Sequence, residues 1–219
     1  MLSPLAEARL SMKTPYPVSV ALVMGTLVSA WPAFAADAAK GKEVFQTNCA
    51  ACHGADGTGT EIMPTIPHLS NPEFLSVASP GLLKAMIENG RPGRPMPTWK
   101  GILGADQIAD VVAYLKQWQT IPDVSVPPGP IHGDVRAGKA IFSTICATCH
   151  GVGGLGQSAP ALNNPGFLKA ASDGYLKKTL EIGRPGTPMR SFLGPSGLAN
   201  LSDQDLNNVV AYIRSWQKK

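Results

Sequence analysis

The sequence has little charge, few aromatic residues, only four cysteines and no long hydrophobic run. Charged residues make up 16% of the 219 residues, and the formal net charge of +4 is too small to suggest a nucleic-acid-binding protein. No apolar run reaches the ~20 residues that a membrane-spanning helix needs, which excludes a multi-pass membrane protein. Four cysteines are too few for a disulfide-dense scaffold. What remains is a globular composition, 44% hydrophobic, with 23 Gly and 20 Pro that predict many turns.

The first 35 residues are predicted to be a secretory signal peptide. Arg9 and Lys13 precede an apolar stretch over residues 18–30, and Ala33-Phe34-Ala35 has the small-x-small pattern of a cleavage site. We therefore expect cleavage after Ala35 and export of the rest of the chain. The alternative is a leader retained as a membrane anchor, for which the apolar stretch is short.

The rest of the chain consists of one sequence unit that occurs twice, which predicts a duplicated domain. Four motifs recur in the same order: GKxxFxxxCAxCHG at 41–54 and 138–151, NPxFL at 71–75 and 164–168, GRPGxPM at 90–96 and 183–189, and VVAYxxxWQ at 111–119 and 209–217. Between the copies lies a Pro-rich stretch without helical periodicity, which is typical of an extended, semi-rigid linker. We predict domains at 36–120 and 131–219, joined by a linker at 121–130.

Each copy is predicted to be helical, with loops between the helices and no alternating strand pattern, so the expected fold class is all-α. The first helix carries residues 42–46 or 139–143. A middle helix runs from Ser79-Pro80 to Gly90, with Ser as N-cap and Gly as terminator, and its equivalent covers about 173–183. The last helix of the first copy carries apolar residues at helical spacing from Ile108 to Trp118. Its equivalent begins at Ser202-x-x-Asp205, close to a capping box.

Each copy contains one Cys-x-x-Cys-His run: Cys49, Cys52 and His53 in the first copy, and Cys146, Cys149 and His150 in the second. This run is the signature of covalent haem c attachment. Positions i, i+3 and i+4 share one side of a helical turn, so two thiols can add to two vinyl groups while the His supplies a nitrogen ligand to the iron. The sequence therefore predicts two covalently bound haem c groups, without which each small half buries only a thin core.

Other uses of the cysteines are a zinc site, a redox dithiol or disulfides in an exported protein. None of these uses requires a His directly after each pair, a Gly after that His, or a shared methionine downstream. The haem interpretation accounts for all of these features.

The sixth iron ligand is predicted to be a methionine, Met96 in the first copy and Met189 in the second. These are the only methionines of the expected mature chain that correspond between the copies; Met63 and Met86 have no equivalents. Each follows a Gly-Arg-Pro-Gly-x-Pro run, in which two prolines restrict the backbone. His and Met together raise the reduction potential relative to two nitrogen ligands.

Further corresponding residues have candidate supporting roles. The carbonyl groups of Pro67 and Pro160 are candidate hydrogen-bond acceptors for the second ring nitrogen of each haem-binding His. Arg91 and Arg184 are candidates for pairing with haem propionates, the alternative being arginines that face solvent. Small residues at Gly41 and Gly138 would let the first helix approach the last one closely, against Tyr114 and Tyr212. His68 and His132 have no counterparts, and we expect them in loops or at the surface.

Together these motifs resemble class I cytochrome c, present as two tandem copies that cover the chain from the first helix of each half to its last. The resemblance implies an all-α fold around each haem, His and Met as axial ligands, and electron transfer in the periplasm. Two-domain, di-haem members include soluble carriers and cytochrome subunits of dehydrogenase complexes. The Gly-Arg-Pro-Gly run and the longer connection after Met189 depart from the common pattern.

Electron transfer by a non-enzymatic carrier is the leading functional prediction, because two six-coordinate haems leave no open position for a substrate. The expected partners are a donor dehydrogenase or quinol-oxidising complex and an acceptor oxidase or reductase. A related hypothesis is that the protein is a permanent subunit of such a complex, which differs from a free carrier only in having a fixed partner. A di-haem peroxidase or sulfur-compound oxidoreductase is the alternative, and it would need a haem that lacks its Met. The halves differ in net charge, −1 over 36–120 and +4 over 121–219. This difference gives the protein a modest dipole that could orient docking on a partner; the alternative is that the charges simply cover ordinary solvated faces.

Overall fold

The computed structural model describes residues 35–61 and 66–217. The predicted signal peptide lies outside these residues, except for Ala35 at the expected cleavage site. In the part of the chain that is described, no helix combines the length and hydropathy needed to cross a membrane.

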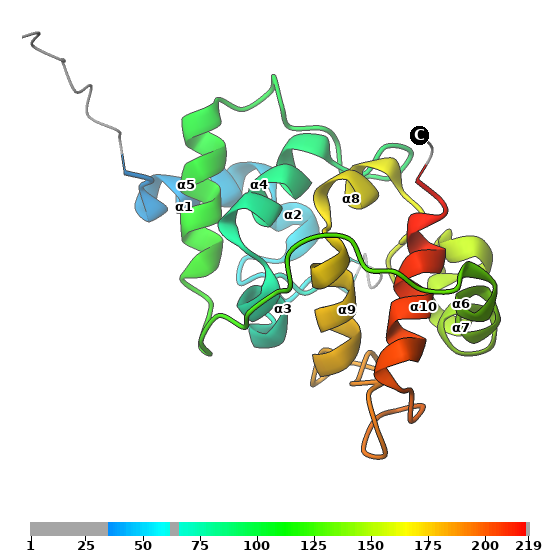
Figure 1. Cartoon of the computed structure of the whole chain (residues 1–219). Helices are drawn as coiled ribbons and strands as arrows, with labels where there is room; N and C mark the ends of the chain where they lie inside the picture. Colours follow the sequence, from blue (N-terminus) through cyan, green and yellow to red (C-terminus); the bar gives the residue numbers. More distant parts are fainter. Residues whose placement is uncertain (1–34, 62–65, 218–219) are drawn as a thin grey trace, which may run out of the picture. The chain divides into compact units, whose positions relative to one another are not determined.

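The first half contains five helices among its described residues (Figure 1). They are α1 (Ala38–Asn48), α2 (Ala50–His53), α3 (Pro72–Val77), α4 (Pro80–Asn89) and α5 (Ala105–Lys116). The middle helix begins and ends where the sequence predicts: the Ser79 hydroxyl accepts a hydrogen bond from the Leu82 N–H at 3.2 Å, and Gly90 is the C-cap. α1 is longer than the short helix predicted there, because the Asp37 carboxylate caps it by accepting from the Ala39 and Lys40 N–H groups.

The second half repeats this order with local differences. Its α-helices are α6 (Val135–Ile141), α7 (Ala147–His150), α8 (Pro165–Ala170), α9 (Asp173–Ile182) and α10 (Asp203–Arg214). A π-helical turn, η1 (Phe142–Cys146), connects α6 to α7, and a 3-10 turn, η2 (Val152–Gly154), follows α7. The predicted capping box at Ser202 and Asp205 is present. The described residues form isolated bridges but no strand, which confirms the all-α fold.

In each half the first helix packs against the last one, α1 on α5 and α6 on α10. Glycine makes this approach possible: a Cβ at Gly41 would lie 1.9 Å from the Asp110 carbonyl oxygen, and a Cβ at Gly138 would lie 1.9 Å from that of Asn208. The predicted packing role of both glycines is thus confirmed. An aromatic trio closes each contact: Phe45, Tyr114 and Trp118 in the first half, and Phe142, Tyr212 and Trp216 in the second.

Residues 121–130 have no regular secondary structure, as predicted for the linker. The Val124 N–H donates to the Ser76 carbonyl oxygen at 2.8 Å, so the linker is attached to the end of α3. It also passes over α9, where a Cβ at Gly174 would lie 2.1 Å from the Pro127 carbonyl oxygen. The linker is therefore packed on both halves, within the single compact unit formed by residues 35–219.

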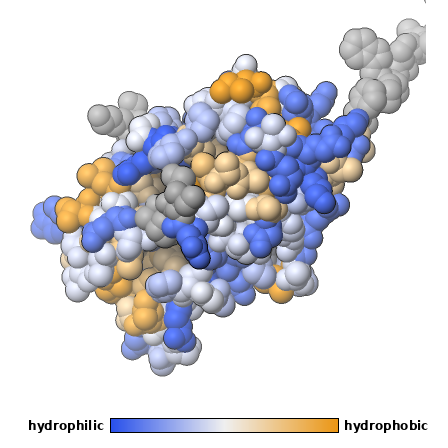
Figure 2. Space-filling view, turned by 180° about the vertical axis from the view of Figure 1, so that it is seen from behind, coloured by the Kyte–Doolittle hydropathy of each residue, from blue (hydrophilic) through white to orange (hydrophobic). Residues whose placement is uncertain are grey.

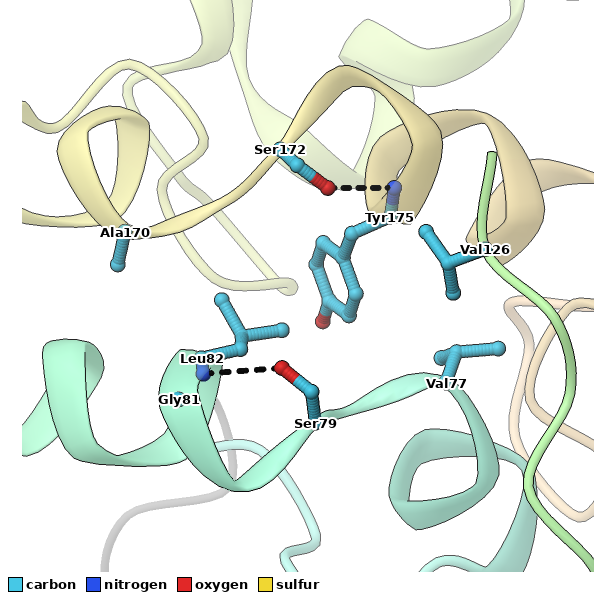
Figure 3. A pocket seen from close by; sticks show the side chains of 8 residues that line it. All are labelled: Val77, Ser79, Gly81, Leu82, Val126, Ala170, Ser172 and Tyr175. Atoms are coloured by element: carbon cyan, nitrogen blue, oxygen red, sulfur yellow. Dashed lines mark hydrogen bonds between the residues drawn. The ribbon is translucent and has the colours of Figure 1, made fainter. Parts of the chain in front are cut away.

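A pocket of about 170 Å³ lies where α4, the linker and α9 meet (Figure 3). The two helices present equivalent N-terminal ends, capped by Ser79 and Ser172, and the Tyr175 ring points into the space. Most of the other lining side chains are small or aliphatic, so the pocket is mainly apolar.

Hydrophobic side chains also reach the surface, in several separate groups among hydrophilic ones on the face in Figure 2. Two of the exposed hydrophobic residues lie at the two ends of η2, Val152 (85% exposed) in its first position and Leu155 (57% exposed) as its C-cap.

Candidate functional site

Both Cys-x-x-Cys-His runs form short helical turns at equivalent places in the two halves. In each run the second Cys and the His lie within α2 or α7, and the first Cys directly precedes that helix. Each turn ends at a glycine with positive φ, 77° at Gly54 and 75° at Gly151, and a Cβ there would lie 2.5 Å from the Gly59 carbonyl oxygen or 2.8 Å from that of Gly156. The Gly that follows each His therefore allows the chain to fold back tightly after the turn.

The two histidines have similar surroundings. Pro160 fulfils its predicted role, since its carbonyl oxygen lies 2.8 Å from Nδ1 of His150. Burial lowers the pKa of both His53 and His150, and the carbonyl groups of Pro67 and Pro160, respectively, act in the opposite direction. Nδ1 of His53 is buried without a hydrogen bond of normal geometry among the described residues, although the Pro67 carbonyl faces it. With Nδ1 directed to a carbonyl, Nε2 is the nitrogen that remains for a metal.

All four cysteines are free. Burial raises the pKa of the Cys49 and Cys146 thiols to about 11, with a smaller contribution from the neighbouring cysteine of each pair. No cluster of three or more Cys, His, Asp or Glu side chains among residues 35–61 and 66–217 could hold a metal ion. This arrangement does not fit a zinc site shared by the two pairs.

The two methionine loops have the same construction. The Arg91 N–H donates to the Met96 carbonyl oxygen at 2.9 Å, and the Arg184 N–H donates to that of Met189 at 2.5 Å. Each loop follows a glycine with positive φ, Gly90 or Gly183. Met96 and Met189 are both half-buried, and Met189 packs against the hydrophobic core.

The side chains of Arg91 and Arg184 contact aromatic rings of the opposite half rather than facing solvent. The Arg91 guanidinium lies 4.6 Å from the centre of the Phe167 ring, and that of Arg184 lies 4.9 Å from the centre of the Phe74 ring. Arg184 also donates to the Tyr175 hydroxyl at 3.0 Å, and Arg91 to the Ala161 carbonyl at 3.1 Å. The sequence identified both arginines as a corresponding pair, but it contained no signal for these contacts.

Two asparagines also form contacts between the two halves. The Asn71 side-chain N–H donates to the Pro185 carbonyl at 3.2 Å, and that of Asn164 donates to the Pro92 carbonyl at 2.9 Å. Each asparagine is also the N-cap of its own helix, α3 or α8. Sequence reasoning found these residues only as matching motif positions. His68 and His132 are exposed, in line with the surface role expected for them.

These donors fit covalent haem c. Each half supplies two free thiols and an imidazole on one short turn, and Nδ1 of His150 is held by a backbone carbonyl, which leaves its Nε2 available. The methionine loop is closed independently by its own backbone hydrogen bond.

Comparisons with known proteins identify the family of both halves. The cytochrome c family model matches residues 38–119 and 135–217. The cbb3-type cytochrome c oxidase subunit FixP of Bradyrhizobium diazoefficiens is 28% identical over 189 residues, which cover 81% of this chain and 60% of that protein. The cbb3-type subunit CcoP of Rubrivivax gelatinosus is 32% identical over 121 residues, 54% of this chain and 36% of that protein.

One solved structure has a similar fold over most of its length. It belongs to the reducing HAO-like protein complex of Kuenenia stuttgartiensis, with a TM-score of 0.54, 25% identity, and coverage of 82% of this chain and 96% of the other. By contrast, the chain spans about 60% of the length of the first curated relatives that it matches. The matches over both halves place the chain in the cytochrome c family, as an all-α protein with two tandem cytochrome c domains and two covalent haem c groups.

Proposed function

We propose that the protein passes single electrons between redox partner proteins in the periplasm, through one haem c in each of the domains at 36–120 and 131–219. The observation that carries this proposal is the repeated pairing of a Cys-x-x-Cys-His turn with a closed methionine loop. A bound haem c supplies one-electron chemistry at its iron.

The chain's own residues attach and orient each haem in this proposal. Covalent attachment is assigned to Cys49 and Cys52 in the first domain and to Cys146 and Cys149 in the second. His53 with Met96, and His150 with Met189, would hold the two irons. The Pro160 carbonyl fixes the orientation of the His150 ring by holding Nδ1. The loop hydrogen bond at Met96 or Met189 limits the movement of the thioether.

Closed coordination favours a carrier over a catalyst. If His53 with Met96 and His150 with Met189 hold the two irons, these side chains would leave no open position for a substrate, and the bound groups would supply electron transfer without bond chemistry. Carbon monoxide added to the reduced protein and peroxide added to the half-reduced protein test this point. We expect no rapid change in the visible spectrum; rapid binding with peroxide consumption would falsify the carrier role and favour a di-haem oxidoreductase.

The relatives support a position next to a terminal oxidase or a related complex. The proteins named FixP and CcoP are subunits of cbb3-type oxidases, and the Kuenenia chain comes from a multi-protein complex. We therefore propose a donor dehydrogenase or quinol-oxidising complex on one side and an oxidase or reductase on the other. The protein acts either as a free carrier or as the cytochrome subunit of such a complex. Purification under mild conditions distinguishes the two, because a subunit co-purifies with its complex in fixed proportion.

The ligand assignment is tested by mass spectrometry and by substitution. The intact mature protein is expected to have the mass of the chain from about Ala36 plus two haem groups. Met96→Ala and Met189→Ala should each remove about half of the Met-to-iron absorption band and lower the potential of one haem. Met86→Ala is the control, because Met86 has no counterpart at Thr179. A protein with one haem, or a band unchanged in both variants, would refute the assignment.

A further inference from the structure

The two halves exchange the same set of contacts in both directions. We call this set the crossed clamp, and it consists of six residues: Asn71, Phe74 and Arg91 of the first half, and Asn164, Phe167 and Arg184 of the second. Each arginine lies over the phenylalanine of the other half, and each asparagine donates to the proline that follows the other half's arginine. Such reciprocity is the pattern of an isologous interface, here formed within one chain.

The crossed clamp is attached directly to both methionine loops. Arg91 touches the second half with its guanidinium while its backbone N–H donates to Met96. Arg184 makes the equivalent connection between the first half and Met189. One residue therefore connects each proposed axial ligand to the opposite domain.

The aromatic side of each contact is fixed by its own helix. The Asn71 side-chain oxygen accepts from the Phe74 N–H at 2.9 Å and so caps α3, which carries the Phe74 ring. The same asparagine uses its N–H to hold the loop of the second half at Pro185. Asn164 has both roles for α8 and the first half's loop. Ring and loop are thus held in register by a single side chain.

The guanidinium groups have no carboxylate partner in the clamp. The ion pairs found among the described residues involve neither Arg91 nor Arg184. The contacts of both groups are aromatic faces, a carbonyl and a hydroxyl instead. A half-buried cation over a ring gains more from the contact than an exposed one, because less water competes for the charge.

We propose that Arg91 and Arg184 are positioning residues that make the methionine ligand of each haem dependent on the opposite domain. This inference rests on the proposed ligand roles of Met96 and Met189. A change in the first half that weakens the contact to Arg184 loosens Met189, although Met189 belongs to the second half. The corresponding change in the second half loosens Met96.

The test follows the displacement of methionine by imidazole in the oxidised holoprotein, read from the loss of the Met-to-iron band. In a Met96→Ala background the remaining band reports Met189 alone. Phe74→Leu in this background is expected to speed the displacement of Met189 about tenfold, because the cation loses its aromatic face. Asn71→Asp is expected to act in the same direction, since Asp retains the helix cap but loses the N–H that holds Pro185.

Phe45→Leu is the matched control. Phe45 is also a buried aromatic residue of the first half, but its ring contacts are Tyr114 and Trp118 of the same half. Phe45→Leu should change the rate of Met189 displacement by no more than about twofold relative to the Met96→Ala protein, because the two sites share no contact partner. The mirror experiment uses Phe167→Leu and Asn164→Asp in a Met189→Ala background and reads Met96.

The outcomes separate this inference from the ligand assignment. If the single methionine variants do not remove their bands, the ligand assignment fails first. If they do, but Phe74→Leu and Asn71→Asp leave Met189 displacement unchanged, the coupling inference is overturned. It is also overturned if Phe45→Leu accelerates the displacement as much as Phe74→Leu, because the effect is then general loosening of the first half.

Discussion

At the scale of single residues, the closest approach in each half depends on the absence of one Cβ atom. Gly41 lies against the Asp110 carbonyl of α5, at a separation that leaves no room for a methyl group. Backbone cannot move aside as easily as a flexible side chain, so added atoms force the helices apart.

Gly41→Ala is therefore expected to destabilise the first half by about 1–3 kcal/mol. Chemical denaturation of the holoprotein, followed by far-UV circular dichroism, measures the change. Gly81→Ala is the matched control, because Gly81 is also helical and the nearest atom to an added Cβ is the Ser79 hydroxyl oxygen at 3.9 Å. It should be neutral or slightly stabilising. Equal destabilisation by both variants would contradict the close-approach argument.

At the scale of elements, the sequence predicted most helices because their local signals agree with the packing. Ser79-Pro80 and Gly90 bound α4, and the Ser202 capping box begins α10. The helices α3 and α8 were missed, although Asn71-Pro72 and its counterpart have the N-cap and first-turn residues of a helix start. Helices of six residues are too short to display apolar periodicity, and their burial comes from the other elements.

The capping box of α10 gives a prediction about pH. The Ser202 hydroxyl and the Ser202 backbone N–H both bond to Asp205, and they lower the pKa of that carboxyl. A pKa lowered by folding stabilises the protein above the unfolded value of about 4, and this stabilisation is lost as the pH falls through the folded value. Ser202→Ala should therefore destabilise the protein by about 1 kcal/mol at neutral pH.

The effect of Ser202→Ala is expected to shrink as the pH falls through the lowered pKa of Asp205 in the folded protein, because the protonated carboxyl no longer gains from the Ser202 hydrogen bonds. Urea denaturation of the holoprotein at neutral and acidic pH measures both values. The first half offers a complementary variant at the corresponding helix: α5 has Gly104 as its N-cap, so Gly104→Ser should be neutral or slightly stabilising. If the loss of stability in Ser202→Ala is the same at both pH values, the stabilisation by Ser202 does not depend on the ionised Asp205 carboxylate, and the prediction is wrong.

At the scale of the whole molecule, the site was predictable within each half and not between the halves. Matched motifs identified the cysteine pairs, the histidines and the methionine loops, because each lies in one short segment. The crossed clamp joins segments about seventy or more residues apart, as in the hydrogen bond from Asn164 to the Pro92 carbonyl, which spans 72 residues. The repeat indicates that Arg91 and Arg184 have equivalent roles, but it does not say which residues they contact. Only the packing of α4 on α8 and of α3 on α9 answers that question.

The packing of the two halves predicts that they unfold together. Gly166 of α8 lies against the first half, where an added Cβ would be 2.2 Å from the Gly90 carbonyl oxygen, directly before Arg91. Gly166→Ala must separate α8 from the methionine loop of the first half, because the three atoms nearest to the added Cβ belong to Gly90 and Pro92. Calorimetry of the wild-type holoprotein should give one cooperative transition, and the variant should give two, the first at a lower temperature. Gly81→Ala, whose added methyl group would meet only the Ser79 hydroxyl oxygen at 3.9 Å, should keep the single transition. A single transition at an unchanged temperature in Gly166→Ala would contradict this prediction. It would mean that the contacts between α8 and the methionine loop of the first half contribute little to the joint stability of the two halves.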